Sequence, residues 1–465
     1  MSGGIIPLLV PNTPDALVIG GGIAGLCAAV DLIERGWTVT LAEQKPRLGG
    51  RAYSFIHPDS GDEVDNGQHL MLGCYHHTLR LIETLGTMEH CSILEPLAIN
   101  FKNVSDTFDM RAPALPAPLH MLGALAGLRT LTLRERVGLL RILPSLMNTT
   151  RSDARFAAMT VSDWLDATHQ SDAARQRLWN ILAVGMLNER PDRASAAYFI
   201  RILRTILFGS RRDASVVLPR RGLSRIFADP AAQFIRSHRG RVLLKTPVSD
   251  LRIEKGRVVS ARVGNEMIEP RVVISAVPHS AIFRCFADGS RSFPEGLVQA
   301  GSFEDVPIVS INLWFDTFFM HEEFTALLDS PIDWVFNRTM IAAPDARRKG
   351  GTEGPMMLSL VVSAARPLAA LSKQAIIETA LCEVRRQYPG ATNARLRHAL
   401  VVKEKRATFS PVPGIDRVRP PTVTSVGNFF LAGDWTDTKL PATIEGAAQS
   451  GYRAAAEADA WLSLR

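Results

Sequence analysis

The sequence predicts a chain of mixed α/β and α+β class, in which a Rossmann-like domain is interleaved with a second domain of mixed sheet and helices. Three observations predict it: a strand, glycine turn, helix and strand near the N-terminus, a return to β-branched runs at 241–277, and an apolar strand followed by a helix at 428–451. The first domain is therefore expected at 1–110, 215–285 and 405–465, and the second at 111–214 and 286–404.

The composition is that of an ordinary globular protein, because 46% of the 465 residues are hydrophobic and 21% are charged. Five cysteines form no CxxC pair, which excludes a disulfide scaffold and a zinc finger, and no His/Cys/Asp cluster has metal-ligand spacing. This cysteine usage favours a cytoplasmic location, and the first sixteen residues lack the basic region and cleavage site of a secretory signal. The uncharged run between Arg111 and Arg129 contains three prolines, so no membrane-spanning helix is expected.

The N-terminal pattern predicts a dinucleotide site. A short apolar strand at 16–19 leads into GGGIAG, which fits GxGxxG and precedes an Ala/Leu-rich helix at 26–35 and a strand at 38–42. In this motif the glycines permit a tight turn, close approach of a pyrophosphate and close packing of the helix on the sheet; here they are Gly20, Gly22 and Gly25. Glu43 follows the second strand, where an acid that binds an adenosine ribose is expected.

A second glycine pair follows directly, in the segment RLGGRAYS at 47–54. Glycines allow close backbone approach and a guanidinium can pair with phosphate, so Arg47, Gly49, Gly50 and Arg51 are candidate phosphate contacts. With RxGGRxxS matched throughout, the sequence resembles the FAD-dependent amine oxidase and carotenoid desaturase superfamily. The resemblance implies that the cofactor is FAD and that Arg51 lies near its pyrophosphate.

The segment DNGQH at 65–69 comes next. The resemblance implies that this segment, with Gly67 and Gln68, runs beside the flavin ring. From the residues alone, Asp65 and His69 are either an acid–base pair or a carboxylate near a hydrogen-bonded core histidine, and both interpretations stay open.

The middle of the chain is basic. Residues 129–241 hold twenty arginines, no lysine and nine acidic residues, in a chain of net charge +7. The arginines alternate with apolar helical stretches and match no recognition motif, so nucleic acid is not an expected partner. The amphipathic part of 113–148 is either a helix packed on the second domain or one that lies on a membrane surface. Ser162 is the expected N-cap of a helix that follows.

Strands return after residue 241, and the resemblance implies that the backbone near Val248 meets the adenine. Further strands are expected at 308–315 and 356–362, with a helix at about 375–386. The chain has no second GxGxxG motif, so a dedicated NADPH site is not expected, and any reducing electrons that the reaction needs must reach the flavin from another, unidentified donor.

The C-terminal region pairs an apolar strand, NFFLAGDWT at 428–436, with a helix that begins near Thr443. The resemblance implies that Gly433 and Asp434 bind the ribityl or pyrophosphate part of FAD, and that Thr443 and Ile444 direct N–H groups at the flavin ring. No cysteine lies near Asp434, so FAD is expected to bind non-covalently.

A narrower resemblance covers nearly the whole chain. The segments DNGQHLMLG, LPAPLH, LNERPDRASA, EKRATFSP and AGDWTDTKLPATIEGAAQSGYRAA are similar to those of hydroxysqualene dehydroxylases. The resemblance implies reductive removal of a hydroxyl group from hydroxysqualene, a lipophilic isoprenoid, to give squalene. Loss of water from an allylic alcohol would need an acid, and hydride from N5 of the reduced flavin would complete the reaction. The candidate polar groups at the flavin face are His69, Asp65 and Glu445.

Two alternatives remain at this stage. A carotenoid or isoprenoid desaturase or oxidase would use the same fold and cofactor in the oxidising direction. A non-catalytic prenyl-lipid carrier, as in the GDP-dissociation inhibitors, would have lost the phosphate-binding glycines, which this chain retains.

Overall fold

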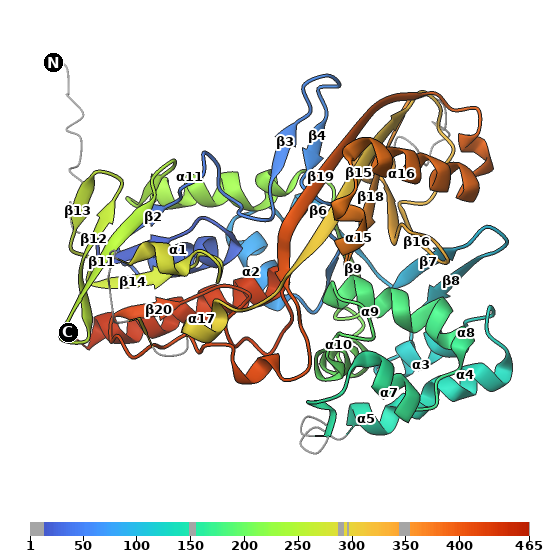
Figure 1. Cartoon of the computed structure of the whole chain (residues 1–465), viewed down its shortest axis with the longest axis horizontal. Helices are drawn as coiled ribbons and strands as arrows, with labels where there is room; N and C mark the ends of the chain where they lie inside the picture. Colours follow the sequence, from blue (N-terminus) through green and yellow to red (C-terminus); the bar gives the residue numbers. More distant parts are fainter. Residues whose placement is uncertain (1–13, 148–154, 287–292, 295–296, 344–353, 465) are drawn as a thin grey trace.

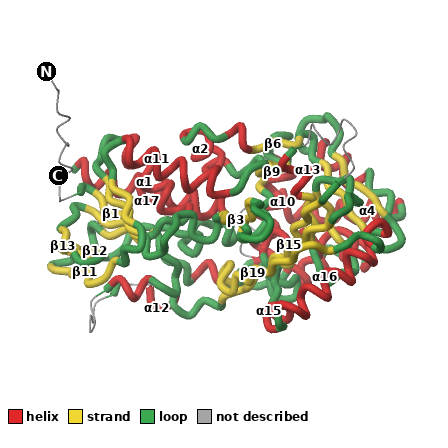
Figure 2. Tube along the Cα trace, turned by 90° about the horizontal axis from the view of Figure 1, so that it is seen from above, coloured by secondary structure: helices red, strands yellow, loops and turns green. Residues whose placement is uncertain are grey.

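The computed structural model describes residues 14–147, 155–286, 293–294, 297–343 and 354–464 (Figure 1). Residues 1–13, which make up most of the segment in which no secretory signal is expected, lie outside the described residues. The chain forms two lobes, one built on a parallel sheet and one on a larger mixed sheet with helices, and the predicted fold class is confirmed (Figures 1 and 2).

The first lobe contains a five-stranded parallel sheet in the order β10-β2-β1-β14-β20. Its strands are β1 (Ala16–Ile19), β2 (Val39–Ala42), β10 (Arg241–Leu243), β14 (Val272–Ser275) and β20 (Phe429–Leu431). All residues of β1, β2, β14 and β20 are buried, as expected for a parallel sheet that is covered on both faces.

Different layers cover the two faces of this sheet. One hydrophobic core joins it to three helices, α1 (Ile23–Glu34), α11 (Asp229–Ser237) and α17 (Ile444–Ser463). A second core joins it to a three-stranded antiparallel sheet of β11 (Val248–Glu254), β12 (Arg257–Val263) and β13 (Glu266–Ile268). The turn between β11 and β12 has positive φ angles at Lys255 and Gly256, as a tight hairpin requires.

The second lobe contains a seven-stranded sheet in the order β19-β15-β18-β17-β16-β7-β8, antiparallel except where β16 pairs with β7. The strands are β7 (Ala98–Lys102), β8 (Thr107–Arg111), β15 (Asp305–Phe315), β16 (Phe324–Leu327), β17 (Trp334–Asn337), β18 (Met356–Val362) and β19 (Leu396–Phe409). Helix α16 (Lys373–Gln387) shares a core with one face of this sheet.

Helices cover the rest of this lobe and share a core with β7, β8, β16 and β17 (Figure 1). They are α3 (Leu119–Ala126), α4 (Leu133–Leu139), η2 (Leu140–Ile142), α5 (Leu143–Met147), α7 (Val161–Ala167), α8 (Asp172–Ala174), α9 (Asn180–Leu187) and α10 (Ala196–Phe208). Thr160 rather than Ser162 caps α7, because its hydroxyl accepts from the Asp163 N–H and the Asp163 carboxylate accepts from the Thr160 N–H. Within the described ranges, no helix is long and apolar enough to cross a membrane.

Two small sheets lie where the lobes meet. One is the hairpin β3 (Ser54–Ile56) and β4 (Glu63–Asp65), and the other joins β5 (Met71–Leu72), β9 (Val216–Pro219) and β6 (Cys91–Leu94). The domain boundaries stay a prediction. In the structure β7 and most of β8, which fall within the expected 1–110 segment, pair in the seven-stranded sheet.

Candidate functional site

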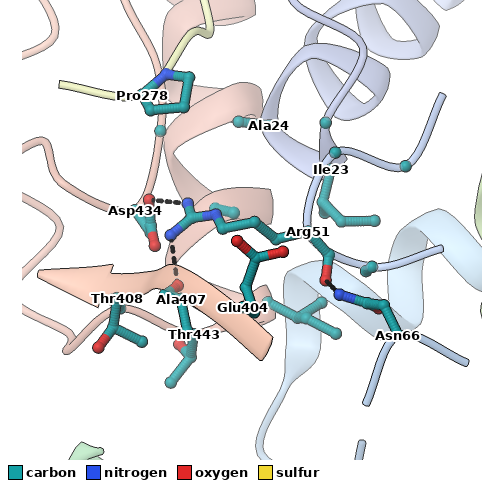
Figure 3. A pocket seen from close by; sticks show the side chains of 18 of the residues that line it. Ile23, Ala24, Arg51, Asn66, Pro278, Glu404, Ala407, Thr408, Asp434 and Thr443 are labelled. Carbon is teal, nitrogen blue, oxygen red and sulfur yellow. Dashed lines mark hydrogen bonds and ion pairs between the residues drawn. The ribbon is translucent and has the colours of Figure 1, made fainter. Parts of the chain in front are cut away.

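A cavity of about 560 Å³ is lined by residues from both lobes, and Figure 3 shows part of this lining. At one end it is lined by the turns that follow β1, β2 and β20, and at the other by α9, β7 and β17. The sequence-predicted residues that line it are Gly20, Gly22, Glu43, Gly49, Gly50, Arg51, Gly67, Gln68, His69, Val248, Gly433, Asp434, Thr443 and Ile444.

The two glycine turns approach each other closely. A Cβ atom at Gly50 would lie 2.9 Å from the Cα of Gly22, and one at Gly25 would lie 1.9 Å from the Gly20 carbonyl oxygen. Gly25 is therefore a packing residue of α1, outside the cavity lining. Gly22 precedes α1, and no side chain caps this helix end, so its N–H groups remain available to an anionic ligand.

Glu43 lines the cavity at this end, whereas Arg47 does not. One Glu43 carboxylate oxygen accepts from the Gly21 N–H at 2.7 Å and the other from the Lys45 N–H at 2.8 Å, which holds the acid beside the glycine turn. Arg47 stacks on the ring of Tyr53 at 3.6 Å and is not among the residues that line the cavity.

Arg51 joins the N-terminal and C-terminal motifs (Figure 3). Its guanidinium donates to Asp434 Oδ1 at 2.6 Å and to the Ala407 carbonyl oxygen at 2.7 Å. Figure 3 also shows the Glu404 carboxylate on β19 close to this ion pair. Residues 356 and 383 positions apart from Arg51 thus meet at one wall of the cavity.

A buried arginine that the sequence gave no reason to select fixes the loop between β20 and α17. The side chain of Arg419 has no exposed surface. Its five N–H groups reach five acceptors, which are the carbonyl oxygens of Asp434, Trp435 and Leu440 and the hydroxyl groups of Tyr198 and Thr438. Arg419 therefore shapes the loop that carries Asp434 and leads to Thr443, the N-cap of α17.

His69 lies in the cavity wall, and its Nδ1 is 2.8 Å from the Gly67 carbonyl oxygen. A carbonyl only accepts, so Nδ1 carries the hydrogen and Nε2 is the ring atom that gains or loses a proton. Burial lowers the pKa of His69 below its ordinary value of 6.5, although the Asp65 charge and the bond to Gly67 oppose this shift. Beside it, the buried Gln68 Oε1 has no hydrogen-bond partner among the described atoms.

Asp65 is buried behind this segment rather than in the cavity lining. Its Oδ1 accepts from the Ser54 hydroxyl at 2.6 Å and from the Leu223 N–H at 3.0 Å. Its Oδ2 has no hydrogen-bond partner within the described part of the chain. Asp65 is near enough to act on His69 through its charge, so the two residues that lie four apart in sequence remain coupled in the structure.

Glu445 occupies a different place from the expected one. Its carboxylate accepts from the backbone N–H and side chain of both His77 and Thr78, at 2.8–3.0 Å, where α2 (His76–Thr84) begins. Although burial opposes the shift, these bonds hold the pKa of Glu445 below its usual value. Glu445 therefore ties α17 to α2 and does not line the cavity.

The far end of the cavity is apolar. Its lining includes Ile99, Leu182, Met186, Ile308, Trp334, Phe336 and Val361. Asn188, which ends α9 in a left-handed conformation, accepts from the Ala364 N–H at 2.7 Å and donates to the Thr408 hydroxyl at 2.8 Å. No sequence motif indicated the apolar lining residues, because they come from separate helices and strands, whereas Asn188 belongs to the segment LNERPDRASA.

The residues at the first end fit FAD. The close approach of Gly22 and Gly50 and the uncapped start of α1 suit a pyrophosphate, and Glu43 lies where an adenosine ribose would be held. The unpartnered Gln68 Oε1 and the start of α17 at Ile444 supply polar contacts nearer the apolar end, where a flavin ring would lie.

The sequence resembles curated proteins that include hydroxysqualene dehydroxylases and carotene desaturases. It is 27% identical to hydroxysqualene dehydroxylase of Rhodopseudomonas palustris, over 94% of this chain and 96% of that protein. It is 25% identical to 15-cis-phytoene desaturase of Synechococcus elongatus, over 93% of each chain.

Solved structures share the fold. Cyclohexylamine oxidase of Brevibacterium oxydans superposes with a TM-score of 0.68 at 18% identity, over 97% of this chain and all of that one. A putrescine oxidase gives a TM-score of 0.70 at 16% identity, over 96% of this chain and 98% of that one. The family described as flavin containing amine oxidoreductase matches residues 23–458. The chain belongs to this family, and it is an FAD-dependent oxidoreductase.

Proposed function

We propose that this enzyme catalyses the reductive dehydroxylation of hydroxysqualene to squalene. The observation that carries the proposal is a single cavity in which glycine turns suited to FAD continue into an apolar end, with His69 in its wall. The likeness to hydroxysqualene dehydroxylases over 94% of the chain supports this substrate class.

The proposed contacts to FAD follow the cavity lining. Glu43 binds the adenosine ribose, Val248 meets the adenine, and the glycine turns and Arg51 surround the pyrophosphate. Arg47 supports this site by stacking on Tyr53 rather than by touching the cofactor. The proposed contacts nearer the ring are Gly67, Gln68, Gly433, Asp434, Thr443 and Ile444.

The protein side of the reaction rests on His69. When bound and reduced, FAD would supply the two electrons of the reaction as a hydride, so that a carbon–hydrogen bond replaces the carbon–oxygen bond. The Nε2–H of protonated His69 donates its proton to the departing hydroxyl group, so that oxygen leaves as water. Asp65, buried behind His69, favours the protonated ring through its charge.

The apolar end of the cavity holds the isoprenoid chain. Trp334 and Phe336 from β17 face the same space as Leu182 and Met186 from α9. These side chains exclude water and present apolar surface to the hydrocarbon chain. Only the hydroxyl-bearing part of the substrate then meets a titratable side chain.

The alternative function is oxidation of an isoprenoid, as in a carotenoid desaturase. The observation that favours it is the likeness to 15-cis-phytoene desaturase, which covers 93% of the chain, against 94% for the likeness to hydroxysqualene dehydroxylase. The two functions require opposite redox states of FAD at the start of turnover, so they can be separated directly.

The test is a single-turnover experiment without oxygen. The FAD-loaded protein is reduced and mixed with hydroxysqualene, while flavin absorbance and extracted squalene are followed together. We expect flavin reoxidation matched by squalene, and about a hundredfold slower reaction in H69Q with its FAD content unchanged. Flavin that stays reduced without squalene formation refutes the dehydroxylase, and phytoene is then tested with the oxidised enzyme.

A further inference from the structure

One helical face on the second lobe exposes apolar side chains to solvent. Helices α4, η2 and α5 follow one another without a break, because Leu139, Leu140 and Leu143 keep right-handed helical backbone angles at the junctions. The exposed residues on this segment are Leu133 (74%), Val137 (60%), Leu140 (40%), Pro144 and Met147 (70%).

Their spacing places these five residues on one face. Steps of four, three, four and three residues repeat the period of an α-helix, and the side chains form a stripe along the segment. The opposite face carries Leu139, Ile142 and Leu146, which are at most 2% exposed and belong to the core of the lobe. The segment is therefore apolar on two faces, and only one of them is used by the fold.

Positive charge flanks the stripe. Residues 129–147 contain four arginines and one acidic residue, Glu135. Arg134 and Arg141 are exposed on the same side of the stripe, seven residues apart. Glu135 accepts from the N–H and the hydroxyl of Thr132 in a capping box, and this single carboxylate leaves the four arginines in excess.

We propose that this face, defined by Leu133, Val137, Leu140, Pro144 and Met147 with Arg134 and Arg141, docks the enzyme on an anionic lipid bilayer. An exposed apolar stripe beside arginines matches the interface between acyl chains and anionic headgroups. A second feature connects this face to the cavity, since α5 packs on α10, α10 packs on α9, and α9 lines the apolar end. The proposal stands on the surface alone and does not depend on the identity of the substrate.

The test uses the FAD-loaded full chain and sedimentation with vesicles of phosphatidylcholine, with and without phosphatidylglycerol. We expect binding to the anionic vesicles that is weakened about tenfold in V137E/M147E and weakened in R134Q/R141Q. The matched control is V259E/M267E, which places the same changes at exposed positions of the three-stranded sheet and should bind as the wild type does.

All variants are first checked for wild-type FAD content and thermal unfolding, which surface changes should preserve. Equal binding of V137E/M147E and the wild type overturns the proposal, and so does equal binding to both kinds of vesicle. A wild type that ignores vesicles but forms a dimer, with a monomeric V137E/M147E, overturns it as well and assigns the face to self-association.

Discussion

Replacement of Arg419 by lysine should weaken FAD binding, although Arg419 does not line the cavity in which FAD is proposed to bind. The guanidinium satisfies five acceptors in the loop around Asp434, whereas an ammonium group can donate only three hydrogen bonds. Two buried acceptors then lose their donor, at about 1–3 kcal/mol each. If about 2 kcal/mol of this loss falls on the FAD-bound state, the Kd for FAD rises about thirtyfold.

The assay is fluorescence titration of the FAD-free protein with FAD, together with thermal unfolding of both forms. Arg220 provides a matched control, because it is also largely buried and bonds to Ser92, Glu323 and the Ile341 carbonyl oxygen, away from the cavity. R220K should lower stability to a similar extent and leave the Kd within twofold of the wild type, on the order of the noise in additive mutations. An R419K protein that folds and binds FAD like the wild type refutes the reasoning.

Three further predictions concern the site. The G50A variant should lose most of its bound flavin, measured by absorbance, because the new Cβ atom would lie 2.9 Å from the Cα of Gly22. The control variant G61A has a similar positive φ, but its Cβ would meet no described atom within 4 Å, so this variant should keep its FAD. The kcat/KM of dehydroxylation should rise as pH falls toward the lowered pKa of His69, because the protonated ring is the active form. The H69Q variant should flatten this pH profile. A kcat/KM that instead increases with pH contradicts the role of His69 as an acid and favours an oxidising reaction. The pKa of Glu445 is lowered by folding, so its contribution to stability is present above pH 4.5 and is lost as pH falls through the lowered value. The Tm difference between the wild type and E445Q should therefore be largest at neutral pH and vanish in acid, whereas a constant difference would argue against this linkage.

The parts of the fold that were predictable are those set by local sequence. The strand at Ala16–Ile19 was expected with the observed bounds, and so was the strand at Met356–Val362. The helix expected to begin near Thr443 does begin there, with that residue as its cap. In each case the signal lies in a short run of apolar residues next to glycine, proline or a capping side chain.

The features that were missed depend on distant contacts. Glu445 stands one residue into α17, but its side-chain direction is decided by the start of α2, which lies more than 360 positions earlier. Arg419 looks like an ordinary surface arginine in the sequence, and only the folded loop gives it five acceptors. No local pattern encodes such pairings, because both partners are common residue types without fixed spacing.

The order of strands in the parallel sheet has a consequence for how the protein is made. The sheet places β14 between β1 and β20, so one edge of the sheet is formed by β20, which ends at residue 431 of 465. The N-terminal lobe cannot finish folding while the middle of the chain is being synthesised. Helix α1 meanwhile lacks α17, its main packing partner. During translation the apolar strands near the N-terminus therefore remain without their C-terminal packing partners. Chaperones that bind nascent chains should increase the yield of this protein more than the yield of a protein whose domains are completed in sequence order.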